Sequence, residues 1–305
     1  MLMGGKTHVI SLPLKWIKKY NVKKGEELEL KEEENKIIVS TEKVHIRPPI
    51  KINLEGANAS VAIKNITNAY QLGYPELELI FSNTTTNDKT QKAVTSLNLI
   101  QETCDQLIGF EITDEKETFC RIKDVAGNSI NEFKNILRKI FLMINTYGTE
   151  TLKNIDNPKK LKELHKKHTD IRKYCNYCQR YLNIKGFENK TAQYNEILVR
   201  LLDVSRTYRF ISKNQLLNKN KYSKETLKVL KTTIKLQEDF YKLFYKFSLA
   251  KASDITRKRI DIFKVINELS KKENSENLIL IHRLPFILNT ILSLMNTTIA
   301  INFKE

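Results

Sequence analysis

The chain has 305 residues, which allows two or three domains at roughly 100 to 200 residues each. Hydrophobic residues make up 41% and charged residues 29% of the chain, a balance that argues against wholesale disorder. The formal net charge of +17 favours acidic partners and disfavours basic ones.

The positive charge is not spread evenly along the chain. Residues 1–44 carry 9 basic and 7 acidic side chains, residues 45–150 carry 11 and 13, and residues 151–305 carry 32 and 15. The entire net excess therefore lies in the second half, where it indicates a surface for an acidic partner. A composition biased toward lysine, with the lysines merely solvated, explains the same numbers equally well.

We expect a cytoplasmic protein without membrane insertion. The N-terminus lacks the apolar core of a signal peptide. The most apolar stretch, Leu278–Ile301, carries His282, Arg283 and two asparagines, which favours a buried bundle helix over a membrane span. The four cysteines are too sparse for a secreted disulfide scaffold and fit a reducing compartment.

The first segment is predicted to form a strand, a short helix and a hairpin. Thr7–Ile10 is β-prone, Pro13 suits the first turn of a helix, and Lys23–Gly25 is expected to end it. Apolar and charged residues then alternate over Glu27–Lys31, and Ile37–Val39 follows a polar turn. This pattern predicts a hairpin with one apolar face.

This segment is too small to fold alone. Residues 1–44 contain only about a dozen large apolar side chains, and such short domains usually need a metal, a disulfide or a partner chain. The segment has neither a cysteine nor a cluster of metal-ligand residues. We therefore expect it to complete its core by oligomerisation.

The rest of the chain predicts a small α/β domain over residues 45–128 and a helical bundle over residues 129–305. The α/β elements are expected, in the order strand, helix, strand, helix and strand, at Ile50–Leu54, Ala59–Leu72, Leu77–Phe81, Thr90–Ile108 and Phe119–Val125. Breaks between the bundle helices are expected at residues 154–159, 185–188, 218–222 and 271–277. The fold class is thus multidomain α+β.

The predicted first helix separates lysines from apolar residues. At ~3.6 residues per turn, three lysines share about 100 degrees of arc, and apolar side chains occupy the opposite arc. The lysines are Lys15, Lys18 and Lys19, with Lys6 just before the helix. Such a face can neutralise DNA phosphates, but a solvated helix face gives the same pattern.

Two ligand-like pairs occur in the second half, His165 with His168 and Cys175 with Cys178. All four are predicted to lie on one helix, where the pairs are about 15 Å apart, so one ion cannot be held by both. The cysteines can share an ion with another segment, act as a redox pair or pack as small apolar residues. We expect the packing role and no metal.

The sequence lacks the usual enzymatic signatures. It contains no glycine-rich phosphate loop, no G-x-S-x-G and no H-E-x-x-H, and its five histidines offer little general-base chemistry. We therefore expect no catalytic residues, no cofactor and no enzymatic activity.

The strings Gly4–Tyr20 and Val22–Leu28 closely resemble the AbrB/SpoVT swapped-hairpin DNA-binding domain, above all in S-L-P-x-x-W followed by K-K-G-[DE]. In that family two chains interleave their hairpins into one β-barrel-like dimer that binds DNA. The resemblance implies a homodimer that binds double-stranded DNA through its N-terminal domain. It places four lysines on or near the basic surface: Lys6, Lys15, Lys18 and Lys19.

The remainder resembles the archaeal PhoU-like regulators, which join such a head to a PhoU helical bundle. Asn68–Tyr74 is similar to their A-Y-x-x-G-Y helix end, Leu107–Ile112 to their L-x-G-x-E-I, and Tyr174–Arg180 to their tyrosine-rich helix closing in arginine. The order and spacing of these motifs carry the resemblance, which extends over almost the whole chain.

PhoU bundles are known for E/D-x-x-x-D helices whose carboxylates hold metal clusters, and the matching positions here differ. His168 with Arg172 and Leu202 with Arg206 stand in place of the acids, and Thr298 stands where the acid before the A-I-N ending falls. Arginine has no lone pair to offer a metal ion. The resemblance therefore implies that the family's metal site is lost.

The two arginines suggest a different ligand. If Arg172 and Arg206 face each other across the bundle, they form an anion site suited to phosphate by bidentate contact. The alternative is that they pair with nearby Asp170 or Asp203, or are solvated.

The resemblance implies a DNA-binding transcriptional regulator, linked to phosphate uptake, in which the bundle senses a ligand or partner. The alternative is a PhoU-type adaptor whose basic bundle docks on a phosphate transporter or a sensor kinase, with the head serving only to dimerise. A third hypothesis is a nucleoid-coating protein that binds DNA without sequence preference through the basic bundle.

Overall fold

The computed structural model describes residues 2–3, 7–33, 35–41, 47–82, 85–87, 93–126, 132–187, 189–219 and 221–303. The chain divides into two compact units, Met1–Arg47 and Pro48–Glu305. The sequence placed boundaries after residues 44 and 128, and the second of these falls inside one compact unit. The reason is that the α/β layer and the helices after it pack against each other.

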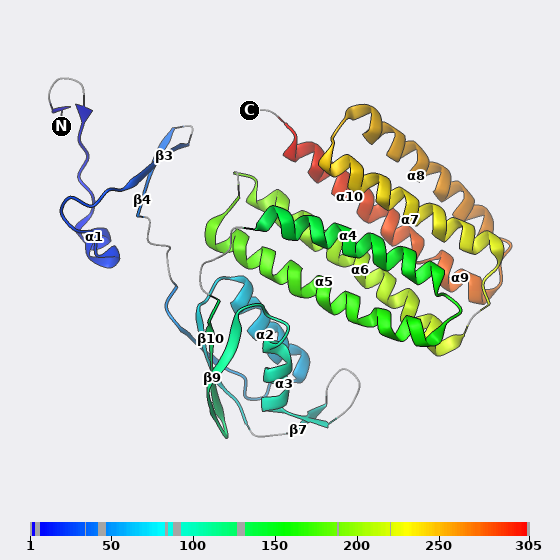
Figure 1. Ribbon diagram of the computed structural model, residues 1–305, viewed down its shortest axis with the longest axis horizontal. Helices are drawn as coiled ribbons and strands as arrows, with labels where there is room; N and C mark the ends of the chain where they lie inside the picture. Colours follow the sequence, from blue (N-terminus) through cyan, green and yellow to red (C-terminus); the bar gives the residue numbers. More distant parts are fainter. Residues whose placement is uncertain are drawn as a thin grey trace. The chain divides into compact units, whose positions relative to one another are not determined.

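The N-terminal unit is built from two short antiparallel ladders and one helix (Figure 1). Its elements are β1 (Leu2–Met3), β2 (Thr7–His8), α1 (Leu14–Tyr20), β3 (Glu29–Glu33) and β4 (Lys36–Ser40). The predicted end of the helix at Lys23–Gly25 is wrong. Helix α1 stops at Tyr20 because Asn21 adopts the left-handed conformation, with φ at 48°, which asparagine tolerates.

The hairpin of this unit has no core beneath it. In β3 and β4, Leu30 pairs with Val39 and Glu32 pairs with Ile37. Leu30 is 67% exposed and Ile37 is 62% exposed, and Leu14 on α1 is 67% exposed. None of the described side chains of this unit is buried. An apolar face this open in a single chain agrees with the predicted deficit of core residues.

The second unit begins with a four-stranded sheet in the order β5-β6-β10-β9. Its strands and the two helices packed with it are β5 (Ile50–Asn53), α2 (Ala59–Gln71), β6 (Glu76–Ile80), α3 (Ser96–Cys104), β9 (Phe110–Lys116) and β10 (Phe119–Asp124). The strands β5 and β6 are parallel and joined through α2, whereas β10 is antiparallel to both of its neighbours. The predicted α/β alternation is therefore present, with β9 as an additional strand.

The two faces of this sheet differ in chemistry. Leu77, Leu79 and Ile122 are fully buried in a core shared with α2 and α3. On alternate positions, Arg121 Nη2 donates to Glu78 Oε1 at 2.9 Å. Because successive strand residues point to opposite faces, one face carries the core and the other carries ion pairs.

The helix predicted over Thr90–Ile108 is shorter than expected. Helix α3 begins at Ser96, because the Thr95 hydroxyl accepts the Asn98 N–H and caps the helix there. The residues before it form β8 (Ala93–Thr95), which pairs with β7 (Thr85–Asn87). The β-branched residues of this stretch favour the hairpin over the first turns of a longer helix.

The remaining described elements are helices that share one hydrophobic core (Figure 1). They are α4 (Phe133–Lys153), α5 (Pro158–Lys185), α6 (Thr191–Asn218), α7 (Lys224–Tyr245), α8 (Leu249–Leu269), α9 (Ser275–Ile281) and α10 (Leu284–Ile301). The predicted breaks separate α4 from α5, α5 from α6, α6 from α7 and α8 from α9. A further break between α7 and α8, at Lys246–Ser248, was not predicted from the sequence.

The apolar stretch near the C-terminus is two helices rather than the single one expected. Helix α9 ends at Ile281, and Pro285 occupies the first turn of α10, where its missing N–H costs nothing. By length and composition, Ser275–Ile301 meets the criteria for a membrane span. In the structure, Ile287 and Ile291 of α10 are fully buried in the bundle core.

Arg180 of α5 joins the bundle to the α/β layer. Its side chain is 3% exposed, and its Nη1 donates to the backbone oxygens of Tyr70 at 2.6 Å and Tyr74 at 3.0 Å. Its Nη2 forms an ion pair with Asp124 Oδ2 at 2.8 Å. The guanidinium carbon also lies 4.9 Å from the centroid of the Tyr70 ring and 5.3 Å from that of Phe110.

Amide groups extend this joint along α5. Gln71 Nε2 donates to Asn176 Oδ1 at 2.9 Å and to Gln179 Oε1 at 2.8 Å. At the end of α2, Gly73 has φ at +90°, and a Cβ atom there would lie 2.7 Å from Cγ1 of Ile184. Only glycine combines this backbone conformation with so close an approach of the two helices.

We expect the joint to depend on the charge of Arg180. The substitution Arg180→Gln leaves the partly buried Asp124 without its cation and should lower the free energy of unfolding by about 3–5 kcal/mol. Urea unfolding of Arg180→Gln, Asp124→Asn and the double variant measures the coupling between the two residues. The exposed Arg257→Gln is the control, and a cost for Arg180→Gln no larger than that of the control would contradict this role.

Candidate functional site

The lysine face predicted for the N-terminal helix is present on α1. Lys15, Lys18 and Lys19 are exposed, whereas Trp16 and Tyr20 are partly buried. The two rings have centroids 5.2 Å apart, so the apolar arc of the helix packs on itself. Lys19 Nζ lies 5.2 Å from the centroid of the Tyr20 ring. The predicted residue Lys6 lies outside the residues that the structure describes.

This surface suits contact with phosphates. Lysine is a compact charge on a flexible stem, which neutralises a DNA backbone without requiring a fixed geometry. The first turn of α1 contains no acidic residue, and the last turn contains Lys18 and Lys19. The helix therefore presents positive charge without a competing carboxylate in its first turn.

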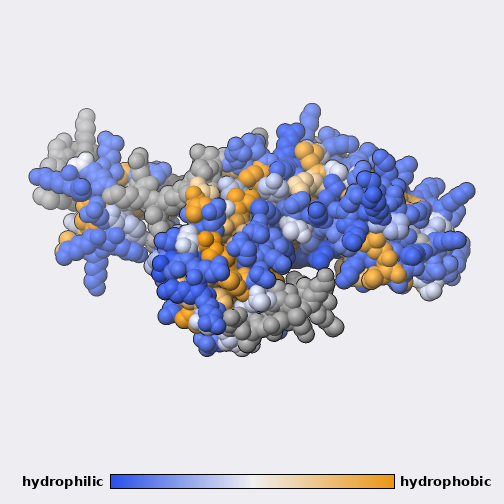
Figure 2. All heavy atoms as spheres, turned by 60° about the horizontal axis from the view of Figure 1, so that its bottom comes forward, coloured by the Kyte–Doolittle hydropathy of each residue, from blue (hydrophilic) through white to orange (hydrophobic). Residues whose placement is uncertain are grey.

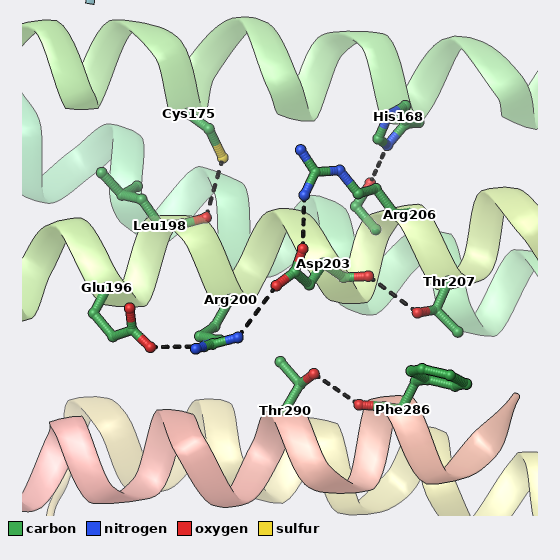
Figure 3. Close-up of polar contacts among 11 residues, drawn as sticks. His168, Cys175, Glu196, Leu198, Arg200, Asp203, Arg206, Thr207, Phe286 and Thr290 are labelled. Carbon is green, nitrogen blue, oxygen red and sulfur yellow. Dashed lines mark hydrogen bonds and ion pairs between the residues drawn. The ribbon is translucent and has the colours of Figure 1, made fainter.

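A second basic region lies on the bundle, along the seam between α5 and α6. The register of these antiparallel helices is set by His168 Nδ1 and Ser205 Oγ, which are 2.9 Å apart. Seven residues further along α5, the Cys175 thiol donates to the Leu198 backbone oxygen at 3.9 Å. Figure 3 shows the Arg206 guanidinium reaching from α6 toward α5, between the levels of His168 and Cys175.

Arg172 and Arg206, the two arginines of the predicted anion site, have different partners in the structure. Arg206 Nη1 forms an ion pair with Asp203 Oδ1 at 2.7 Å, as the alternative interpretation predicts. Arg172 does not pair with Asp170 and instead donates to Gln106 Oε1, an uncharged amide oxygen at the end of α3. The two arginines lie on neighbouring helices at the surface of the seam rather than across the core of the bundle.

Other residues, not predicted from the sequence, gather around Arg172. Burial, followed by the positive charges of Arg209 and Arg206, lowers the pKa of the Arg172 guanidinium. Burial, followed by the charges of Arg209 and Lys213, lowers the pKa of His165. The sequence alone shows that the basic positions 206, 209 and 213 recur at helical spacing. It does not show which helix packs beside them.

The residues that the predicted resemblance to PhoU aligns with metal-binding acids do not form a ligand set. Leu202 is 8% exposed within the core, and the Thr298 hydroxyl donates to the Leu294 oxygen of its own helix at 2.7 Å. Among the described residues, no group of three or more histidine, cysteine, aspartate or glutamate side chains is placed to hold a metal ion.

The cysteines behave as apolar residues. Cys104, Cys120, Cys175 and Cys178 are all buried as free thiols. Burial raises the pKa of the Cys175 thiol to about 12 and also raises the pKa of Cys178. Because the thiolate is the form that binds metals and reacts with disulfides, these protonated thiols suit packing rather than redox chemistry.

The α/β layer holds a separate cavity of about 350 Å³ at the carboxyl ends of β5 and β6. Asn58, Ser82 and Ser96 supply polar groups, and Phe81 and Leu99 supply apolar surface. Two of the polar side chains bond to the protein itself, since the Asn58 side chain caps α2 and Ser96 Oγ donates to the Ser82 backbone oxygen.

Comparison with known proteins identifies the N-terminal segment. Residues 2–48 match the family described as antidote-toxin recognition MazE, bacterial antitoxin. This match supports the predicted AbrB-like head, and the chain therefore carries a MazE/AbrB-like domain at its N-terminus. Neither the curated proteins nor the solved structures contain a match to the chain. The resemblance of the remainder to PhoU stays a prediction.

The position of His165 makes stability depend on pH. Its pKa is lowered from the ordinary value of 6.5, so the folded state holds fewer protons than the unfolded state. This contribution to stability is complete above about pH 6.5 and is lost as the pH falls through the folded pKa. We expect the loss of thermal stability between about pH 7 and pH 5 to be smaller in His165→Gln than in the native protein. Equal losses in both proteins would show that His165 does not contribute.

Proposed function

We propose that this protein is a homodimeric DNA-binding transcriptional regulator that acts in the cytoplasm and has no enzymatic activity. The observation that carries the proposal is the N-terminal domain, which matches a MazE/AbrB-like family and has no buried side chain among its described residues. A domain of this kind requires a partner surface to fold stably.

A second copy of the same domain is the partner that fits best. The apolar residues of β3, β4 and α1 form the part of the domain that burial would stabilise, and each Å² of apolar surface removed from water contributes about 25 cal/mol. Leu30 and Ile37 alone are 67% and 62% exposed. An isologous contact would bury this surface on both chains at once.

Dimerisation also doubles the lysine face of α1. Two copies of Lys15, Lys18 and Lys19, related by a two-fold axis, match the approximate two-fold symmetry of an operator. Lysine contacts to phosphates supply affinity and position the protein, whereas base contacts supply sequence preference. The proposal therefore assigns DNA affinity to these lysines, with Lys6 as a further predicted contributor.

We further propose, from the resemblance of the remaining chain to PhoU-like regulators, that the regulated process is phosphate uptake. The motifs Asn68–Tyr74, Leu107–Ile112 and Tyr174–Arg180 support this step. The second candidate function is an adaptor that docks on an acidic surface of a phosphate-transport or signalling protein. It is favoured by the 32 basic against 15 acidic side chains of residues 151–305.

The dimer requires the exposed apolar face of the N-terminal domain. Ile37→Glu places a charge where the second chain would bury an isoleucine, so we expect dissociation to monomers at micromolar concentration. Analytical ultracentrifugation measures the mass directly. The control is Leu249→Glu, because Leu249 is 70% exposed on α8 and should leave the dimer intact. Full-length protein that is already monomeric would contradict the proposal.

DNA binding requires the lysine face of α1. Replacing Lys15, Lys18 and Lys19 by glutamine should weaken binding uniformly across sequences, and log K should fall less steeply with log salt, by about 0.9 for each phosphate that is no longer neutralised. Fluorescence anisotropy on operator fragments, recovered by genome-wide mapping of bound DNA, measures both effects.

Three exposed bundle lysines, Lys153, Lys235 and Lys264, form the matched control. Unchanged affinity in the α1 variant together with weaker binding in the control would favour the nucleoid-coating alternative.

A further inference from the structure

The seam between α5 and α6 collects cationic side chains from both helices. Arg172 lies on α5 midway between His168 and Cys175, two of the residues that contact α6. Arg206 directly follows Ser205, the partner of His168, and its guanidinium reaches toward α5 (Figure 3). The antiparallel register places the backbone of Arg206 near His168 rather than opposite Arg172. Its side chain carries the guanidinium between the levels of His168 and Cys175, where Arg172 lies (Figure 3).

Further cations follow along the same face of α6. Arg209 and Lys213 lie about one and two turns beyond Arg206, since a turn contains ~3.6 residues. Both side chains are exposed. The charges of Arg209 and Lys213 reach as far as His165 on α5, whose pKa they lower together with burial. The cluster is therefore a stripe of positive charge that both helices share.

Counter-charge along this stripe is scarce. Asp203 accepts from Arg206 at 2.7 Å, but it also pairs with Arg200 at 3.6 Å. Arg172 donates to the neutral Gln106, and within the described part of the chain neither Arg209 nor Lys213 forms an ion pair. Elsewhere in the described bundle, Arg180, Arg200 and Arg257 each pair with a carboxylate. One carboxylate shared with Arg200 does not neutralise four cations.

An uncompensated cation cluster is most costly where it is least hydrated. Arg172 is only partly exposed, and Arg209 and Arg206 add to the effect of burial in lowering its pKa. Arginine stays protonated under these conditions, so repulsion among the guanidinium groups is not relieved by loss of a proton. It is relieved when an anion binds between them.

We propose that the α5–α6 seam binds a small, multiply charged oxyanion of the phosphate class through Arg172, Arg206 and Arg209. The planar guanidinium offers paired donors that match the oxygens of such an anion. The partly buried position of Arg172 favours a small ligand over the phosphates of a rigid duplex, which contact protruding side chains.

The site also bridges two layers of the second unit. Arg172 contacts Gln106, and the neighbouring Lys173 Nζ donates to the backbone oxygen of Asp105 at 2.8 Å. Two successive residues of α5 are therefore bonded to the turn after α3. An anion that draws Arg172 toward Arg209 would compete with the bond to Gln106. The ligand thereby affects the contact between the bundle and the α/β layer.

The test is calorimetric titration of the full-length protein with inorganic phosphate and with pyrophosphate, in a buffer without other multivalent anions. We expect both to bind, with pyrophosphate the tighter. Arg172→Gln and Arg209→Gln should each weaken binding by about tenfold or more. Arg209 is exposed, so its variant tests the site even if Arg172→Gln fails to fold. Arg257→Gln, which removes an exposed bundle arginine outside the stripe, should leave binding unchanged.

Two results would overturn the proposal. One is that neither inorganic phosphate nor pyrophosphate gives a heat of binding at concentrations up to ~10 mM, which excludes dissociation constants in the millimolar range or below. The other is binding that Arg172→Gln and Arg209→Gln leave unaltered. If neither anion binds but both variants lose affinity for duplex DNA, the stripe is a DNA surface and the small-anion assignment is wrong. These titrations contain no DNA, so their outcome does not depend on DNA binding by the N-terminal domain.

Discussion

A single buried arginine organises the larger unit of this protein. Arg180 satisfies the backbone oxygens at the end of α2, neutralises Asp124 at the end of β10 and lies against two aromatic rings. Its donors bind groups from different elements, so the α/β layer cannot shift on α5 without exposing or orphaning several polar groups at once. Together with the amide bonds of Gln71, these contacts tie two hydrophobic cores into one compact unit.

The N-terminal unit illustrates the opposite situation. It has regular elements, a short helix and a paired hairpin, yet its apolar side chains remain at the surface. Local hydrogen bonding decides its secondary structure, whereas its stability depends on surface that a single chain does not bury. This separation explains why the proposed dimer and the proposed DNA-binding face belong to the same short segment.

Charge is organised more locally than the net value of +17 suggests. Hydrophilic side chains cover most of the face of the molecule shown in Figure 2, with apolar residues in narrow strips between them. Many bundle cations bind partners three or four residues away along the same helix, such as Lys258 with Asp254. The residual positive field arises where such partners are missing, and the α5–α6 seam is one such place.

The amino-acid pattern determined which segments became helices and strands, because periodicity and capping act over a few residues. It therefore placed the hairpin of the head, the α/β alternation, most of the bundle breaks and the lysine arc of α1. It misplaced the start of α3 and the division of the apolar C-terminal stretch, where a threonine cap and Pro285 outweighed the longer pattern.

Only the tertiary structure decided which distant residues became neighbours. From the sequence, Arg172 and Arg206 form an anion site only if they face each other across the bundle, and no pattern in it joins them with Arg209 or joins Arg180 with Asp124. Those contacts depend on the register between α5 and α6 and on the docking of the sheet, which arise from side-chain packing over the whole unit. Local pattern specifies elements, and long-range packing specifies sites.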